Sequence, residues 1–234
     1  MDIQAFIDAL KAQGIELTSR MLEQFELYYT LLVEWNEKMN LTHITQKQDV
    51  YLKHFYDSLT LAFDHPLSHE HLMDIGAGAG FPSIPLKIVY PDIRVTIVDS
   101  LNKRITFLNH LIDALALEQV EAVAARAEVY AADHREQADI VTARAVARLQ
   151  ILDELCLPLV KPGGWFIAQK GSQGEVEWQE ACHGVQKLGG RLEHMHAFTL
   201  PGTEEKRVNL YIYKEKATPK AYPRLFAKIK KNPL

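Results

Sequence analysis

The sequence predicts an α/β fold in which helices cover both faces of a mostly parallel, seven-stranded sheet, with a helical segment before the sheet. Three observations support this prediction. Short apolar runs of strand length alternate with longer runs of helical spacing. A glycine-rich turn follows the first apolar run, as in nucleotide-binding βαβ units. The 234 residues are enough for one such domain and a modest extension.

The first predicted strand, residues 72–75, is short and apolar enough to be buried, and it carries Asp74 near its end. Glycines alternate with alanines in the turn that follows: Gly76, Gly78 and Gly80. Glycine permits positive φ and lets a ligand approach the backbone without meeting a Cβ atom. The turn is therefore a candidate binding loop.

A helix and a second strand complete this βαβ unit. Pro82 and Pro85 are tolerated only in the opening turn of a helix, so we expect the helix to begin there. The strand at 93–98 ends at Asp99. A ligand crevice is expected above the carboxyl ends of both strands.

The acidic residues indicate which ligand this crevice binds. The dinucleotide spacing G-x-G-x-x-G fails, because the sixth position from Gly76 is Phe81. Asp99 lies 21 residues beyond Gly78 and could accept both ribose hydroxyls of an adenosine, in NAD or in S-adenosylmethionine. A carboxylate at Asp74 would repel a pyrophosphate but attract an ammonium and a sulfonium group. The sequence therefore favours S-adenosylmethionine over NAD, and over a turn that binds nothing.

Two helices are predicted before this unit. Apolar residues recur at helical spacing up to Gly14 and again over 19–39, where Ser19 is the expected N-cap and Asn40 the terminator. The apolar stripe of the longer helix predicts core packing rather than a platform for bases.

A third helix is predicted from a cap at Thr45 to about residue 62. It carries His54 and Asp57. A histidine near a carboxylate is more often a hydrogen-bonded structural group than a catalyst, so the sequence leaves the roles of these two residues open.

The rest of the chain continues the alternation of helices and strands. Helices are predicted at 103–115, 149–160 and 174–188. Strands are predicted at 120–124, 139–143, 165–169, 191–199 and 207–213. The last two strands should form a pair that closes the sheet.

Composition narrows the class of protein. The two cysteines, Cys156 and Cys182, form neither a metal pattern nor a disulfide framework, which predicts a reducing compartment. No apolar stretch reaches membrane length and the amino terminus does not resemble a signal peptide, so we expect a cytoplasmic protein that contacts no membrane. No metal is expected, because the histidines before the first strand lack standard zinc spacing: His65, His69 and His71.

The net charge of −4 conceals an asymmetry. Residues 214–234 hold six lysines, one arginine and one acidic residue, a net of +6, so the remainder carries −10. A basic end on an acidic body suggests contact with a polyanion, although a solvated tail would show the same pattern.

Several acceptor chemistries are disfavoured by residues that the sequence lacks. The fourth predicted strand ends in Thr142-Ala143-Arg144-Ala145 instead of the D/N-P-P-Y stretch of enzymes that methylate exocyclic amines. Neither cysteine lies beside an evident activating group, as a 5-methylcytosine enzyme would need. No compelling cluster provides a metal or a poised base for a phenol or carboxylate. An acceptor that needs no deprotonation remains.

Several segments together carry a resemblance to a known family: DIGAGAGFPSIPLKI, VDSLNKR, ARAE, TARAVA, the QKG after the fifth strand and TPKAYPR. With the amino-terminal segments EKMNLT and KHFYDSL, the chain resembles the bacterial small-subunit ribosomal RNA guanine-N7 methyltransferases, the GidB or RsmG family. One departure follows Arg224, where Leu225-Phe226-Ala227-Lys228 stands in place of a glycine-containing turn.

The resemblance implies a class I S-adenosylmethionine-dependent methyltransferase fold and methylation of one guanine N7 in 16S rRNA. It also implies cofactor contacts at positions that match the family's motifs: Gly76, Phe81, Ala127, Glu128 and Arg144. Guanine N7 has a lone pair and no proton, so no general base is required. No catalytic side chain is therefore assigned.

Cations are expected at the mouth of the site, as phosphate or base-edge contacts: Lys103, Arg104, Lys170 and Arg207. Arg224 in the basic tail is a further candidate for RNA contact. The predicted division is a helical extension at 1–65, a methyltransferase domain at 66–214 and a basic tail at 215–234. We expect a monomer that acts on 16S rRNA or on a precursor of the small subunit; free RNA and an assembled particle both stay open as substrates.

Two other functions also stay open. A methyltransferase of small molecules would be insensitive to salt, and an RNA-binding protein that has lost activity would use S-adenosylmethionine only structurally. The intact Asp74, Gly76, Gly78 and Asp99 disfavour the second of these, and the basic tail disfavours the first.

Overall fold

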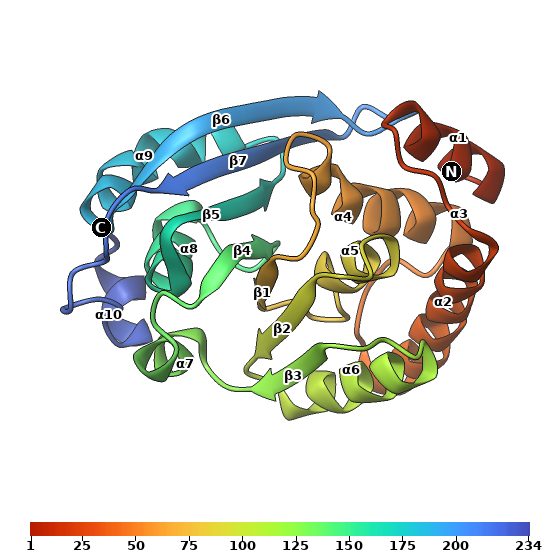
Figure 1. Cartoon of the computed structure of the whole chain (residues 1–234), viewed down its shortest axis with the longest axis horizontal. Coiled ribbons are helices and arrows are strands. Elements are labelled where there is room, and N and C mark those ends of the chain that lie inside the picture. The colour runs from red at the N-terminus through yellow and green to blue at the C-terminus, as the bar shows by residue number, and fades with distance from the viewer.

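The computed structural model describes residues 1–234 and contains one seven-stranded sheet in the order β3-β2-β1-β4-β5-β7-β6 (Figure 1). The strands are β1 (His71–Ile75), β2 (Arg94–Asp99), β3 (Val120–Ala124), β4 (Ala138–Arg144), β5 (Val160–Lys170), β6 (Gly190–Thr199) and β7 (Lys206–Lys214). Strands β1 to β5 are parallel, and β7 runs antiparallel to both β5 and β6. The predicted mostly parallel sheet with a closing strand pair is confirmed.

Helices cover both faces of this sheet. They are α1 (Ile3–Ala12), α2 (Ser19–Met39), α3 (Lys47–Val50), the π-helix η1 (Tyr51–Tyr56), α4 (Asp57–Leu59), the 3₁₀ helix η2 (Thr60–Ala62), α5 (Ser83–Val89), α6 (Asn102–Ala114), α7 (Ala127–Asp133), α8 (Leu149–Cys156), the 3₁₀ helix η3 (Leu157–Leu159), α9 (Gly174–Lys187) and α10 (Phe226–Lys231). One core joins one face of the sheet to α1, α2, η1, α5 and α6. A second core joins the other face to α7, α8, α9 and α10.

Burial follows strand position. Every residue of the central strand β1 is buried, as expected for a parallel strand covered on both faces. In the edge strand β6 only Gly190 is buried, and the other residues are exposed or half-buried. The ligand crevice predicted at the β1–β2 end of the sheet therefore lies over its most buried strands.

The helix caps differ from the prediction. The predicted cap of α2 at Ser19 is wrong: Thr18 caps it by accepting a hydrogen bond from the Met21 amide at 3.2 Å. Asn40 ends α2 in the left-handed conformation, as predicted. The predicted cap at Thr45 is also wrong, because the next helical stretch starts at Lys47 after Gln46, which makes no side-chain capping bond.

The carboxyl-terminal segment is packed on the body rather than extended. Ile229 of α10 is fully buried in the core that contains α8, and the ammonium of Lys214 is buried and bonded to the carbonyls of Leu157 and Val160. The exposed lysines Lys228 and Lys230 lie on the outside of α10. The basic end therefore presents its charge from a folded helix. No helix in the structure combines the length and apolarity that crossing a membrane requires.

Candidate functional site

A cavity of about 560 Å³ opens over the carboxyl ends of β1, β2, β3 and β4. Its volume is in the range of small-molecule sites. Its lining includes residues at the ends of β1, β2, β3 and β4 and in the turns and helix starts that follow them: Gly76, Ala77, Gly78, Ala79, Phe81, Asp99, Ser100, Arg104, Ala125, Arg126, Ala127, Glu128, Arg144, Ala145 and Val146. Seven of the eight predicted cofactor residues line this single cavity; Asp74 is the exception.

Backbone conformation explains the glycines of the first turn. Gly76 and Gly78 have φ of +75° and +61°, values that side chains rarely allow. A Cβ atom on Gly76 would also lie 2.7 Å from Val146 Cγ2. A Cβ atom on Gly78 would meet no protein atom within 4 Å. Since Gly78 lines the cavity, that open space is available to a ligand.

Asp99 connects the glycine turn to the start of α6. Its carboxylate is almost fully buried and accepts hydrogen bonds from the amides of Gly78 (3.2 Å) and Leu101 (3.0 Å). Arg104 pairs with the same Oδ2 atom at 3.1 Å. Oδ1 accepts only the Leu101 amide, so a carboxylate lone pair remains for a hydroxyl donor from the cavity.

Asp74 lies beneath the turn, outside the cavity lining. Its Oδ2 accepts the amide of Ser83 at 3.0 Å, at the first residue of α5, while Oδ1 is buried without a partner. Burial raises the pKa of Asp74 to about 7, and the hydrogen bond from Ser83 opposes that rise. The predicted acidic position is thus one layer below the cavity, where it supports the turn and contributes its field.

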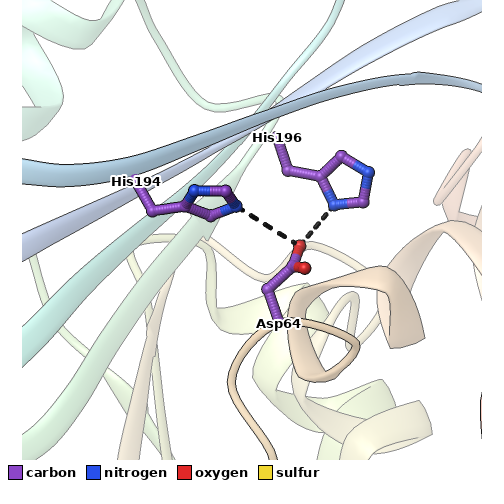
Figure 2. A group of neighbouring side chains, drawn as sticks. All are labelled: Asp64, His194 and His196. Carbon is purple, nitrogen blue, oxygen red and sulfur yellow. Dashed lines mark hydrogen bonds and ion pairs between the residues drawn. The ribbon is translucent and has the colours of Figure 1, made fainter.

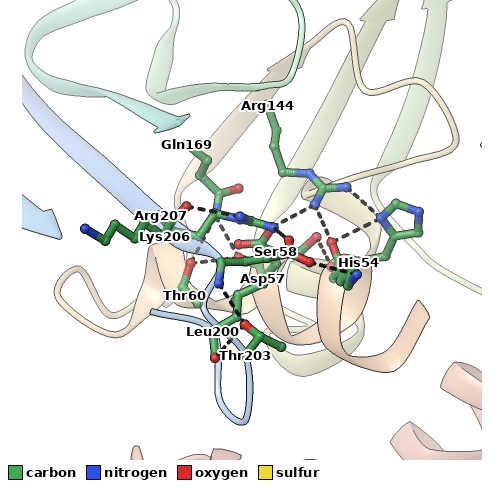
Figure 3. Close-up of polar contacts among 12 residues, drawn as sticks. His54, Asp57, Ser58, Thr60, Arg144, Gln169, Leu200, Thr203, Lys206 and Arg207 are labelled. Carbon is green, nitrogen blue, oxygen red and sulfur yellow. Dashed lines mark hydrogen bonds and ion pairs between the residues drawn. The ribbon is translucent and has the colours of Figure 1, made fainter. Parts of the chain in front are cut away.

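Arg144, at the end of β4, is held by a polar network (Figure 3). Its Nη1 donates to the Lys53 carbonyl at 2.9 Å and lies 3.3 Å from Asp57 Oδ2. Arg207 Nε donates to that same oxygen at 3.0 Å. The side-chain Nε2 of Gln169 donates a hydrogen bond to the backbone carbonyl of Asp57 at 2.8 Å. Asp57 therefore joins two arginines and fixes the guanidinium of Arg144 at the edge of the cavity.

His54 is the pocket residue whose role the sequence left open. Its ring stacks on Phe81 with centroids 4.4 Å apart, and Arg144 Nη2 lies 3.2 Å from its Nδ1 atom. Its Nε2 atom is 2.9 Å from the hydroxyl of Thr42. Burial and the neighbouring Arg144 lower the pKa of His54 to about 3. The histidine is therefore neutral near pH 7 and serves as a packed, hydrogen-bonded wall of the cavity.

The cavity also contains residues that the sequence analysis did not identify: Leu41, Thr42, Ser100, Val146, Leu155 and Phe226. Phe226 is the first residue of α10, so the carboxyl-terminal segment reaches the pocket. Leu41 and Thr42 come from the N-terminal extension and Phe226 from the tail, whereas Ser100 and Val146 lie in the VDSLNKR and TARAVA segments and Leu155 lies in α8. Only the resemblance at EKMNLT pointed toward Leu41 and Thr42.

The predicted RNA-contacting cations do not form one ring. Arg104 lines the cavity, and Lys103 is exposed with its ammonium bonded to the Met39 carbonyl at 3.0 Å. Three others are held by intramolecular ion pairs: Lys170 with Glu177 (2.7 Å), Arg207 with Asp57 and Glu205 (3.0 Å each), and Arg224 with Glu154 (2.6 Å). The predicted contacts of these three with RNA stay predictions, and none of the three lines the cavity itself. The cause is the sheet order, because β5 and β7 lie beyond β4 from the glycine turn.

The chemistry of the cavity fits an adenosine that carries a positively charged group. A free lone pair on Asp99 suits a ribose hydroxyl. The glycine turn leaves room for a ligand to approach its backbone at Gly78, and the unpartnered oxygen of Asp74 lies beneath this turn. Both cysteines are unsuitable as nucleophiles in this cavity, since neither Cys156 nor Cys182 lines it.

Solved structures with low sequence identity share this fold. The crystal structure of M. jannaschii TYW2 in complex with AdoMet aligns with a TM-score of 0.58 at 17% identity, covering 74% of this chain and 79% of that one. A putative methyltransferase from Bacillus halodurans aligns with a TM-score of 0.55 at 14% identity, covering 69% of this chain and all of that one. At such identities the likeness concerns the fold alone, which is that of class I S-adenosylmethionine-dependent methyltransferases.

Sequence relatives are much closer. A protein of Staphylococcus carnosus named Ribosomal RNA small subunit methyltransferase G is 56% identical over all of this chain and 99% of its own length. The protein of the same name from Bacillus velezensis is 55% identical with the same coverage. The model of the GidB family, described as rRNA small subunit methyltransferase G, matches residues 21–207. The chain therefore belongs to the GidB family.

Proposed function

We propose that this chain transfers the methyl group of S-adenosylmethionine to N7 of a specific guanine in 16S rRNA, in the cavity over β1, β2 and β4. The family membership supports the reaction and the RNA class. The observation that carries the proposal is that seven of the predicted cofactor residues, at or just after the ends of four strands, line one cavity of suitable volume.

The residues divide into two groups around the proposed ligand. Asp99 would accept ribose hydroxyls, with the backbone of Ala127 and the side chain of Glu128 beside the adenine. Arg144 would bind the carboxylate of the methionine portion, because a guanidinium is suited to bidentate recognition of carboxylates. S-adenosylmethionine supplies an electrophilic methyl group on a sulfonium.

Transfer to N7 requires alignment more than proton movement. Guanine N7 presents a free lone pair, so its bond to the methyl carbon forms as the carbon–sulfur bond breaks, and no proton leaves. Holding the two reactants in line can contribute on the order of 7–11 kcal/mol to the lowering of the barrier. Neither titratable neighbour is placed to act as a general base, because the pKa of His54 is lowered to about 3 and Asp74 lies outside the cavity lining.

The RNA would enter with its target base unstacked. The major groove of A-form RNA is too deep and narrow for side chains, so N7 must be presented from a loop or a flipped nucleotide. Val146 is 40% exposed at the end of β4, and Phe226 lines the same cavity. These apolar side chains suit contact with a base face. The exposed Arg126 beside the cavity and the lysines of α10 suit contacts with phosphates.

Methyl transfer to defined acceptors tests the proposal. Purified protein would be incubated with S-adenosylmethionine carrying a labelled methyl group and, separately, unmodified 16S rRNA, assembled small subunits and transfer RNA. Borohydride reduction followed by aniline cleavage detects N7-methylguanosine. We expect one cleavage site in 16S rRNA, and the better of the first two acceptors identifies the natural substrate. Cofactor binding without incorporation into any RNA would contradict the proposal and favour a small-molecule acceptor.

A further inference from the structure

A second cluster of polar side chains lies at the far edge of the sheet from β3. Figure 2 shows Asp64, from the loop after η2, directed toward His194 and His196 of the edge strand β6. One ligand atom from each side chain lies within 4.8 Å of the other two. His196 Nδ1 is paired with Asp64 Oδ2, and His194 Nε2 lies 3.9 Å from that oxygen. None of the three lines the methyl-transfer cavity.

A β-bulge directs both histidines to this side. Leu192 and Met195 pack on the same core although they are three residues apart, which a regular strand does not permit. The register of β6 against β7 shifts between Leu192 and His194. The shift turns His194 and His196 to the opposite face, which Phe198 also occupies as it packs on the other core. Bulges commonly re-aim side chains next to functional sites.

The loop that carries Asp64 is anchored to the sheet independently of the histidines. The hydroxyl of Tyr211 in β7 donates to the Leu61 carbonyl at 3.0 Å and lies 3.5 Å from Asp64 Oδ2. Tyr211 is also the register partner of His194, with ring centroids 5.5 Å apart. The folded chain thus brings together two segments that are 132 residues apart, before any ligand binds.

We propose that Asp64, His194 and His196 form a binding site for Zn²⁺. Two imidazoles and one carboxylate are ordinary zinc ligands, and solvent can complete the tetrahedron. Imidazole nitrogen disfavours Mg²⁺ and Ca²⁺, which prefer oxygen ligands, and the lack of a thiolate in the cluster disfavours Cu⁺. Zinc bonds of about 2.1 Å would place the ligand atoms roughly 3.4 Å apart. His194 would therefore move toward Asp64, while the directly paired His196 and Asp64 would move apart to admit the ion.

The exposure of the cluster suits an ion that arrives from solvent. The side chains of Asp64, His194 and His196 are 31%, 52% and 35% exposed, so rotation of exposed side chains is enough to close the site. A bound ion would tie the loop after η2 to β6. Because it binds the folded state alone, it would raise stability by mass action. Strand β6 is four strands away from β1 and the glycine turn in the sheet order, so we assign the ion no role in methyl transfer.

Metal titration of the full chain tests the site. Metal-free protein would be titrated with ZnCl₂ against a chromophoric chelator, and with CoCl₂ while visible absorption reports the coordination. We expect one equivalent to bind to the wild type. Asp64→Ala, His194→Gln and His196→Gln should each weaken binding by roughly tenfold or more. His65→Gln is the matched control, since His65 lies against Trp165 and outside the cluster.

A thermal measurement separates binding at this site from binding elsewhere. The melting temperature of the wild type should rise with Zn²⁺, and that of His194→Gln/His196→Gln should not. Circular dichroism of the double variant checks that it folds, and the single variants keep the test valid if it does not. Equal zinc affinity in the wild type and all cluster variants, or no binding in the wild type, would show that the cluster is an ion pair only and overturn the proposal. Methyl transfer measured in excess chelator reports the proposed function separately.

Discussion

A substitution at Gly78 tests whether a ligand needs the open space beside its Cα atom, and a matched control accounts for the backbone strain that any side chain adds there. Gly78→Ala places a methyl group in the cavity, so we expect S-adenosylmethionine affinity to fall by at least tenfold, as measured by calorimetry. Gly14→Ala is the matched control, because Gly14 also has a positive φ (+78°) and open space around it, but lies outside the cavity. Both changes should cost about 1 kcal/mol of stability. Equal affinity in the two variants would contradict the assignment of the turn to the cofactor.

Asp74 and His54 should give opposite dependences of stability on pH. Burial raises the pKa of Asp74 from 3.8 to about 7, so between these values the folded state keeps a proton that the unfolded chain has lost, and stability falls as pH rises. Burial lowers the pKa of His54 from 6.5 to about 3, so here the unfolded chain holds the extra proton and stability rises with pH. In the wild type the two contributions oppose each other between about pH 4 and pH 6.5.

Single substitutions separate these contributions. Relative to the wild type, Asp74→Asn should make the free energy of unfolding increase more steeply with pH, by up to about 1.4 kcal/mol per pH unit. His54→Gln should change the slope by a similar amount in the opposite direction. Urea denaturation across this pH window measures both slopes, and the other titrating groups form a common background. If neither substitution changes the slope, burial does not shift the pKa values of Asp74 and His54 as described.

Asp57 is predicted to position Arg144 for the cofactor. Asp57→Asn removes the negative charge between two arginines, so Arg144 should lose its fixed orientation and S-adenosylmethionine affinity should fall by about tenfold. Glu205→Gln is the control, because Glu205 contacts Arg207 and Lys53 but not Arg144. Calorimetry gives the affinities. If both variants bind the cofactor like the wild type, Arg144 does not depend on Asp57.

At the scale of elements, segments with a clear apolar pattern were predictable, and short helices that depend on packing were not. The bounds predicted for β3 (120–124) and α9 (174–188) agree with the structure within one residue, because apolar periodicity and glycine or proline signals mark them. Helices α7 and α10 were not predicted, since each is short and depends on packing. Strand β5 begins at Val160, five residues before the strand predicted at 165–169, and a register shift against β4 absorbs the additional residues.

The anchoring of α10 leads to a prediction about stability. Arg224 makes an ion pair with Glu154, which is fully buried, and donates to the Asn232 carbonyl at 3.0 Å. Arg224→Ala would leave a buried carboxylate unpaired, so we expect a loss on the order of 3 kcal/mol in the free energy of unfolding. Arg191→Ala removes an arginine whose ion pairs are all exposed, and should cost less than about 1 kcal/mol. Similar losses in urea denaturation would contradict a structural role for Arg224.

At the scale of the whole molecule, the cofactor side of the site was more predictable than the RNA side. Asp99 and the glycine turn follow directly from the βαβ pattern, because parallel strands bring their carboxyl ends to one edge. The surroundings of Lys170 and Arg207 depend on strand order and on partners such as Glu177 and Asp57, which are distant in sequence. Charge at a motif can be read from sequence, whereas its neutralisation by a distant carboxylate cannot.

The charge asymmetry of the molecule yields a prediction about RNA affinity. Lys228, Lys230 and Lys231 are exposed on α10, which begins at the cavity with Phe226. Replacing all three lysines by glutamine should weaken binding to 16S rRNA and reduce the slope of log affinity against log salt by about 2–3, because each phosphate contact releases a counterion. Filter binding at several salt concentrations measures the slope. S-adenosylmethionine affinity should stay unchanged.

The control removes the same charge from the opposite end of the chain. Lys11, Arg20 and Lys38 are exposed on α1 and α2, so replacing them by glutamine lowers the net charge equally without touching α10. A local contact predicts a change of slope only for the α10 variant. If both triple variants lose the same affinity and slope, the RNA responds to the total charge of the protein, and α10 is not part of its binding surface.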